Sequence, residues 1–191
     1  MTPFSTLSRR RLVGGGLAAV AAASLSGCAS LTGGPSIGRV VIVGGGFGGA
    51  TAARYLRLWG GNVDVTLVER NASFVSCPIS NLVLGGHKQM SDITVSYAAL
   101  EAMGVKRIQG DAVAIDAQTK EVRLADGRKL PYDRVIVSPG VDFMFDQVAG
   151  LSTPAAQEKF LHGWKAGAQT VALRRQLEAM PDGGVYALAI P

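Results

Sequence analysis

The chain has 191 residues, of which 48% are hydrophobic and 25 are glycine, so it is long and apolar enough to bury a core and is not a disordered chain. Its formal net charge is +5, from 19 Lys and Arg against 14 Asp and Glu. Three of the basic residues, at positions 9–11, lie in a leader-like segment; without them the balance is 16 against 14, or +2. The other basic residues are scattered, so we expect no nucleic-acid partner.

Residues 1–28 are typical of an export signal. Arg9, Arg10 and Arg11 precede a weakly apolar, Ala- and Gly-rich run over 12–25, about 14 residues where a membrane-spanning helix needs roughly 20. SRRRLV at 8–13 fits a twin-arginine signal, which predicts a folded protein exported to the periplasm. The alternative, an amphipathic basic helix, would need a periodicity that the segment lacks.

A possible lipid anchor and a linker follow the signal. LSGC at 25–28 resembles a bacterial lipobox, in which Cys28 would become the lipidated N-terminus. Cleavage at another small residue nearby is the alternative, and Cys28 would then be lost or incidental. Residues 29–38, rich in Gly, Ser and Pro, are predicted to be a linker.

The next segment has the pattern of a dinucleotide-binding unit. Arg39–Val43 is a β-branched run that predicts a buried parallel strand, and the motif Gly44-x-Gly46-x-x-Gly49 follows at once. Helix-forming residues come next, and Asp64–Glu69 predicts a second strand. The order strand, glycine loop, helix, strand is specific, although a Gly-rich turn in an ordinary α/β domain is the alternative.

Each part of this pattern has a physical reason. Gly44 permits a tight turn, Gly46 lets the backbone approach a pyrophosphate, and Gly49 allows the helix to pack closely on the strand. The helix N-terminus offers free N–H groups to the phosphates. Glu69, 20 residues after Gly49, would accept the ribose hydroxyls and disfavour a 2′-phosphate, and we expect Arg70 in the same site. FAD and NAD both remain open at this point.

The second half predicts a helix and a set of short strands. A helix is expected over Ser91–Met103, closed by Gly104, and hairpin turns at 117–120 (AQTK) and 125–128 (ADGR). These strands resemble the antiparallel segment inserted in two-dinucleotide flavoprotein reductases, which favours FAD. The resemblance implies that the backbone of Val113 meets adenine and that Gly140, in VIVSPG at 135–140, approaches the flavin nucleotide, although Ser138-Pro139 departs from the common ATG form.

The predicted fold class is therefore α/β: a Rossmann-type, three-layer FAD/NAD(P)-binding fold with an inserted small antiparallel β-segment. The FAD-binding domain is expected over 39–150. Residues 151–191 are expected to begin a second dinucleotide-type domain that is truncated, with a helix over Lys165–Met180 and an opening strand in GGVYALAIP at 183–191.

Several stretches together resemble the flavoprotein subunit of flavocytochrome c sulfide dehydrogenase. They are VVIVGGGFGGATAARYLR at 40–57, SCPISNLVLGG at 76–86, YDRVIVSPG at 132–140 and HGWKAGAQTVALRRQLEAMPDGG at 162–184. The resemblance implies an FAD enzyme that oxidises sulfide and passes electrons to a c-type cytochrome subunit; the chain has no CxxCH motif, so the haem would belong to that partner. The redox disulfide of the family uses cysteines beyond this region, so no catalytic residue is assigned and the chain is interpreted as an N-terminal fragment.

Cys77 is the cysteine of the SCPISNLVLGG loop. In the family the cysteine at this position is bonded through a thioether to the 8α-methyl group of FAD, and the resemblance implies the same for Cys77. A thiolate is a strong nucleophile, so the chemistry is reasonable. The alternatives are a small buried hydrophobic residue or an intermolecular disulfide in an oxidising compartment.

Two other functions stay open. One is a sulfide:quinone or NADH:quinone oxidoreductase of the same fold, and the other is a non-catalytic flavin-binding remnant. No metal site is expected, because His87 suits a solvated loop, His162 suits a packing role, and neither has a partner with metal-ligand spacing.

Overall fold

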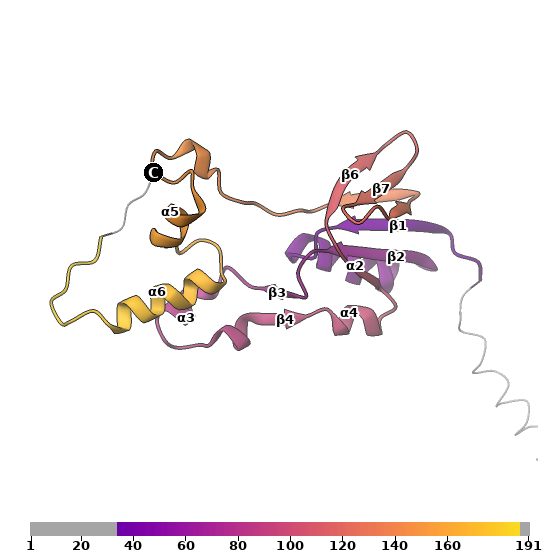
Figure 1. Cartoon of the computed structure of the whole chain (residues 1–191). Coiled ribbons are helices and arrows are strands. Elements are labelled where there is room, and N and C mark those ends of the chain that lie inside the picture. The colour runs from indigo at the N-terminus through magenta and orange to yellow at the C-terminus, as the bar shows by residue number, and fades with distance from the viewer. Residues whose placement is uncertain (1–33, 188–191) are drawn as a thin grey trace, which may run out of the picture.

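A four-stranded parallel sheet forms the core of the first of two groups of elements in the structure (Figure 1). The structure is a computed structural model that describes residues 34–187; the predicted export signal, Cys28 and the first part of the linker lie outside the described residues. The strand order is β5-β2-β1-β9. The strands are β1 Gly38–Val43, β2 Val63–Glu69, β5 Lys106–Gln109 and β9 Arg134–Val137. The first two strands therefore confirm the predicted pair.

Two layers cover this sheet, one on each face. On one face Ile42 and Leu67 pack against Ala53 of helix α2, Phe47–Trp59. On the other face Val41 and Val68 pack against a small antiparallel sheet. Alternating side chains along each strand point to opposite faces, so both faces of the central strands are apolar and buried. The predicted three-layer Rossmann-type fold is confirmed.

The antiparallel sheet is the inserted segment that the sequence predicted. Its strands are β6 Ala112–Asp116, β7 Glu121–Leu124 and β8 Lys129–Pro131. Both predicted hairpin turns are present, with positive φ angles of 54° at Lys120 and 87° at Gly127. A register shift between Ala112 and Ala114 interrupts the pairing of β6 with β7. The turns are therefore local features that sequence alone could predict.

The helix predicted over Ser91–Met103 was wrong. The segment instead forms a 3-10 turn η1 Met90–Ile93, a strand β4 Thr94–Ser96 and a short helix α4 Ala98–Ala102. Strand β4 pairs antiparallel with β3, Ser73–Val75. Because the β-branched Thr94 and Val95 find a partner strand that lies far away in sequence, pairing overrides the helical pattern. Gly104 does end α4, with a φ of 85°.

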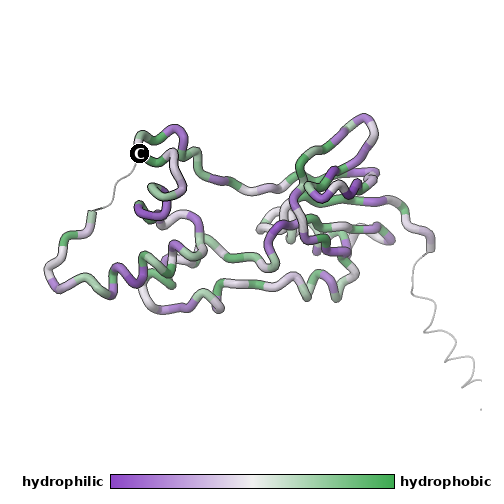
Figure 2. Tube along the Cα trace, viewed as in Figure 1, coloured by the Kyte–Doolittle hydropathy of each residue, from purple (hydrophilic) through white to green (hydrophobic). Residues whose placement is uncertain are grey.

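Strands β3 and β4 lead from the main sheet to a second group of helices (Figure 1). Here α3 Ser80–Leu84 packs against α6 Ala168–Glu178, and η2 Phe145–Gln147 and α5 Pro154–Lys159 complete the group. Helix α6 carries both hydrophobic and hydrophilic residues (Figure 2). The domain boundary expected near residue 150 stays a prediction.

Two predictions at the C-terminal end need correction. The helix expected over Lys165–Met180 begins three residues later, at Ala168, because Gly167 is extended and donates its N–H to Thr170 Oγ1 at 3.1 Å. Residues 184–187 form no strand and pair with none of the described sheets; the rest of the predicted strand, residues 188–191, lies outside the described residues.

Candidate functional site

The glycine loop joins β1 to α2 at the carboxyl edge of the parallel sheet. Gly44 has a φ of 98°, and a Cβ atom placed on it would overlap the carbonyl oxygen of Ser138. A Cβ on Gly49 would overlap the carbonyl oxygen of Gly44. The loop thus has the tight turn predicted for Gly44 and the close helix packing predicted for Gly49, since only glycine fits at either position.

Gly46 differs from Gly44 and Gly49 because a Cβ atom placed on it would overlap no other atom. It is the N-cap of α2, no side chain caps the helix, and no acidic residue lies in the first turn. The nearest atom to a Cβ placed on Gly46 would be Phe74 Cε2, at 3.8 Å. The first N–H groups of a helix have no partner within the helix and attract phosphate oxygens. The loop therefore fits a dinucleotide pyrophosphate, as predicted, although ligand binding itself stays a prediction.

Glu69 lies at the mouth of this loop. Its Oε2 accepts the N–H of Gly45 at 2.7 Å, and its Oε1 accepts the backbone and side-chain N–H groups of Asn71, both at 2.8 Å. A carboxylate can accept about four hydrogen bonds, and the exposed Asn71 side chain can turn to water. The structure thus brings Glu69 and the glycine loop together, with acceptor capacity left for ribose hydroxyls.

The turn after β9 packs against the glycine loop. The N–H of Ser138 donates to the carbonyl of Val43 at 2.8 Å, and a Cβ on Gly48 would lie only 2.6 Å from Ser138 Oγ. Gly140 follows with a φ of 80° and no atom near its Cβ position. The carboxyl ends of β1, β2 and β9 therefore converge on one edge, which is where open α/β sheets bind ligands.

The two remaining predicted nucleotide residues lie farther along this edge. Arg70 follows β2, and its Nε pairs with Asp111 Oδ1, just after β5, at 2.8 Å. Val113 is exposed on β6, at the register shift between Ala112 and Ala114. Neither residue forms a hydrogen bond or an ion pair with the glycine loop in the described chain. Their roles toward adenosine stay predictions.

Cys77 lies after β3 in the second group of helices. Its thiol is free and exposed and donates to the carbonyl of Trp164, and Ser80 caps the turn by donating its N–H and Oγ to the Cys77 carbonyl at 3.0 and 2.8 Å. The alternative of a small buried hydrophobic residue does not fit an exposed side chain. The thiol is held in place by its loop, yet a ligand can reach it.

Tyr97 and Gly45 belong to the site but were missed by sequence reasoning. Tyr97 is only 5% exposed, and its hydroxyl donates to the Gly45 carbonyl at 3.0 Å. Burial, followed by the nearby charge of Glu69, raises the pKa of Tyr97 to about 12, so its hydroxyl stays a donor. The sequence held one local sign of this contact: position 45 is a glycine, although the motif allows any residue there.

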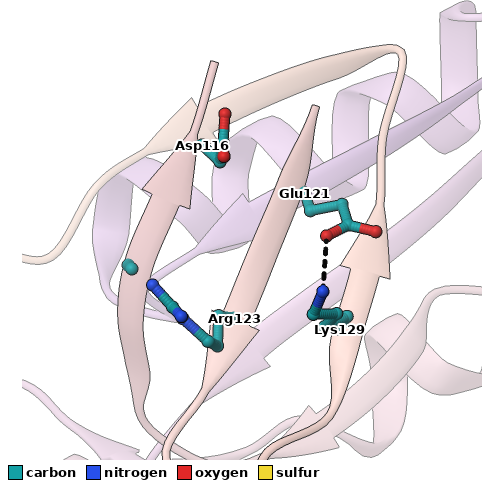
Figure 3. A pocket seen from close by; sticks show the side chains of 5 residues that line it. Asp116, Glu121, Arg123 and Lys129 are labelled. Atoms are coloured by element: carbon teal, nitrogen blue, oxygen red, sulfur yellow. Dashed lines mark ion pairs between the residues drawn. The ribbon is translucent and has the colours of Figure 1, made fainter. Parts of the chain in front are cut away.

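A shallow hollow elsewhere on the surface involves none of these residues. It lies on the antiparallel sheet and is lined by Ala114, Asp116, Glu121, Arg123 and Lys129 (Figure 3). Glu121 and Lys129 form an ion pair at 3.4 Å. The N–H groups of Thr119 and Gln118 hold the pKa of Asp116 below its ordinary value. The charged groups of this hollow thus make contacts within the antiparallel sheet and its hairpin turn.

Histidines and acids form no metal cluster in the part of the chain that the structure describes. His162 packs with its ring 4.3 Å from that of Phe143, which fits the packing role expected for it, and burial lowers its pKa. Over the same residues, 34–187, no helix is long and apolar enough to cross a bilayer.

Comparison with known proteins gives sequence and structural relatives. A 45-residue stretch is 60% identical to the flavoprotein chain of sulfide dehydrogenase (flavocytochrome c) from Chlorobaculum thiosulfatiphilum, over 24% of this chain and 94% of the compared sequence. Mitochondrial sulfide:quinone oxidoreductase of Mus musculus is 28% identical over 120 residues, 63% of this chain and 27% of that protein. The sulfide:quinone oxidoreductase structure from Aquifex aeolicus has a TM-score of 0.61 at 25% identity, over 73% of this chain and 31% of that one.

The chain thus spans about a third or less of the mouse and Aquifex proteins that it matches. The profile of the pyridine nucleotide-disulphide oxidoreductases matches residues 38–180, from the start of β1 to just beyond α6. That match supports an oxidoreductase fold and a flavin cofactor, in agreement with the open glycine loop and Glu69. The chain belongs to the pyridine nucleotide-disulphide oxidoreductase family.

Proposed function

We propose that this chain is the FAD-binding part of a flavoprotein that oxidises sulfide and passes the electrons to a c-type cytochrome. The observation that carries the proposal is the 60% identity over 45 residues with the flavoprotein chain of a flavocytochrome c sulfide dehydrogenase. Bound flavin would supply the redox chemistry, because it takes up electrons in pairs and releases them singly. The protein would supply binding and orientation.

The described residues divide this work along the sheet edge. Gly46 would present its N–H to the pyrophosphate, and Glu69 would accept the ribose hydroxyls. Strand β3 leads from this edge toward the loop of Cys77 (Figure 1). An extended FAD along that path would bring its flavin ring to the exposed thiol, which we propose to be its covalent attachment point.

The test of the reaction is anaerobic reduction of the full-length protein. Sulfide should bleach the flavin absorbance, and oxidised cytochrome c should restore it faster than a soluble quinone analogue. A flavin that sulfide does not bleach would contradict the proposed substrate. Recovery with quinone alone would contradict the cytochrome acceptor.

A sulfide:quinone oxidoreductase is the second candidate. It is favoured by the likeness to proteins of that name from Mus musculus and Aquifex aeolicus. The two candidates share the substrate and differ in the acceptor, so the same reoxidation experiment separates them.

Covalent attachment has its own measurement. Acid denaturation of full-length protein should leave the flavin on the polypeptide, and the peptide containing Cys77 should carry the added mass of FAD or its fragment. Cys77→Ser should release all flavin into the supernatant. Complete release from the wild-type protein, with an unmodified peptide mass, would contradict the attachment.

Export to the periplasm by the twin-arginine route is also part of the proposal. It is supported by SRRRLV at 8–13. Replacing Arg9, Arg10 and Arg11 by lysine should keep the precursor in the cytoplasm. Labelling with a radioactive fatty acid should distinguish a lipidated Cys28 from cleavage elsewhere, since only the former would incorporate the label.

A further inference from the structure

Tyr97 reaches the glycine loop from a distant part of the chain. It lies between β4 and α4, 52 residues after Gly45, and donates its hydroxyl to the Gly45 carbonyl at 3.0 Å. A Cβ atom on Gly45 would lie 2.5 Å from the Tyr97 hydroxyl oxygen and 2.8 Å from Cζ. The tyrosine therefore occupies the space that any side chain at position 45 would need.

This contact sets the direction of the next N–H group. The described peptide bonds are all trans, so the carbonyl of Gly45 and the N–H of Gly46 point in opposite directions. Tyr97 holds that carbonyl on the buried side of the loop. The N–H of Gly46 is thereby turned away from Tyr97, and none of the backbone hydrogen bonds of the described residues uses it.

The preceding peptide, between Gly44 and Gly45, is also oriented by a side chain, that of Glu69. Glu69 accepts the N–H of Gly45 at 2.7 Å, while the carbonyl of Gly44 points toward the place where a Cβ on Gly49 would be. Two successive peptide planes are therefore oriented by side chains outside the loop, although glycine itself has no preferred orientation.

Arg107 keeps the tyrosine ring in place. Its guanidinium carbon lies 5.1 Å from the centre of the Tyr97 ring. The same guanidinium donates to the carbonyls of Asn71 and Ala72 at 3.1 and 3.2 Å, just after Glu69. Tyr97 is thus packed between the glycine loop and the segment that follows β2.

We propose that Tyr97 is a positioning residue of the dinucleotide site, whose hydroxyl orients the Gly45–Gly46 peptide so that the Gly46 N–H donates to the pyrophosphate. Tyr97 does not touch the ligand. The proposal rests on the flavin-binding function proposed above. It adds a residue whose effect on binding is confined to the phosphate part of the ligand.

The test compares Tyr97→Phe with Tyr132→Phe in the full chain carrying Cys77→Ser, so that FAD binding is reversible. Tyr132 is a matched control: it is 6% exposed and donates its hydroxyl to a backbone carbonyl, that of Asp116, at 3.1 Å, on the other face of the sheet. Affinity for FAD is measured by flavin fluorescence, and affinities for ADP and adenosine by competition. Thermal unfolding of each variant checks that it is folded.

Tyr97→Phe should weaken FAD and ADP about fivefold to tenfold, the worth of one hydrogen bond, and leave adenosine unchanged because it has no phosphate. Tyr132→Phe should leave all three affinities unchanged. Equal affinities in the two variants would overturn the proposal, as would an equal loss for ADP and adenosine, which would mark a general collapse of the site.

Gly45→Ala disturbs the same contact by a change in the loop rather than in the tyrosine. It provides a second test if Tyr97→Phe does not fold. Its methyl group must displace the Tyr97 ring, so ADP should weaken and adenosine should not. Unchanged ADP affinity would overturn the proposal. A Cys77→Ser chain that binds no FAD at all would overturn the flavin-binding function itself, which is a separate result from FAD binding that is insensitive to position 97.

Discussion

Replacing Glu69 by alanine tests the centre of the site, because one carboxylate accepts a hydrogen bond from the glycine loop and is also predicted to bind the ribose. The change removes three hydrogen bonds. The two from Asn71 are exposed, so water replaces them at little cost. The bond from the Gly45 N–H is partly buried, and its loss should dominate the effect on stability.

The magnitude follows from the strength of a hydrogen bond to a charged group, about 1.5–3 kcal/mol. Losing about 2 kcal/mol should lower the melting temperature by roughly 4–8 °C for a chain of this length. If Glu69 also binds the ribose hydroxyls, the affinity for FAD should fall by roughly 10- to 100-fold.

Asp133→Ala supplies the matched control. Asp133 also accepts a backbone N–H at 2.7 Å, that of Arg39, but at the opposite, amino edge of the same sheet. The assay is thermal unfolding by circular dichroism, followed by titration of FAD fluorescence, both in a Cys77→Ser background. Asp133→Ala should leave FAD affinity at the wild-type value.

Two outcomes would refute the reasoning. Unchanged FAD affinity in Glu69→Ala would remove Glu69 from the ribose site. Equal losses of FAD affinity in Glu69→Ala and Asp133→Ala would show that general destabilisation, rather than a lost ligand contact, explains the effect.

Three further predictions concern the same loop. Gly49→Ala should destabilise the fold strongly, because the new methyl group meets the backbone of Gly44, and a wild-type melting temperature would contradict this. Gly46→Ala should melt like wild type yet bind FAD weakly, because its methyl group would fill the phosphate approach; wild-type FAD affinity would contradict this. The raised pKa of Tyr97, about 12 against an ordinary 10.0, stabilises the protein fully below pH 10, and this contribution is lost as the pH rises toward 12. Melting temperatures over that range should therefore fall more steeply for wild type than for Tyr97→Phe, and parallel curves would count against it.

Features that depend on residues adjacent in the sequence could be predicted from the sequence alone. The strand before Gly44, the glycine turn, helix α2 and the strand ending at Glu69 follow from local periodicity and fixed spacing. The hairpin turns at Lys120 and Gly127 follow from turn chemistry in the same way. These elements bring the Glu69 carboxylate and the glycine loop together at one edge of the sheet.

The contacts that complete the site depended on the tertiary structure. Strand β4 exists because β3 pairs with it, and this pairing takes Tyr97 out of the predicted helix and into the core beside Gly45. The packing of Ser138 on Gly44 likewise joins two turns from opposite ends of the domain. Contacts of this kind depend on which distant segments meet in space, and they leave no periodic pattern in either segment. The sequence by itself therefore determined the glycine loop and the carboxylate from which a dinucleotide site is predicted, whereas only the tertiary structure decided which side chains orient that loop.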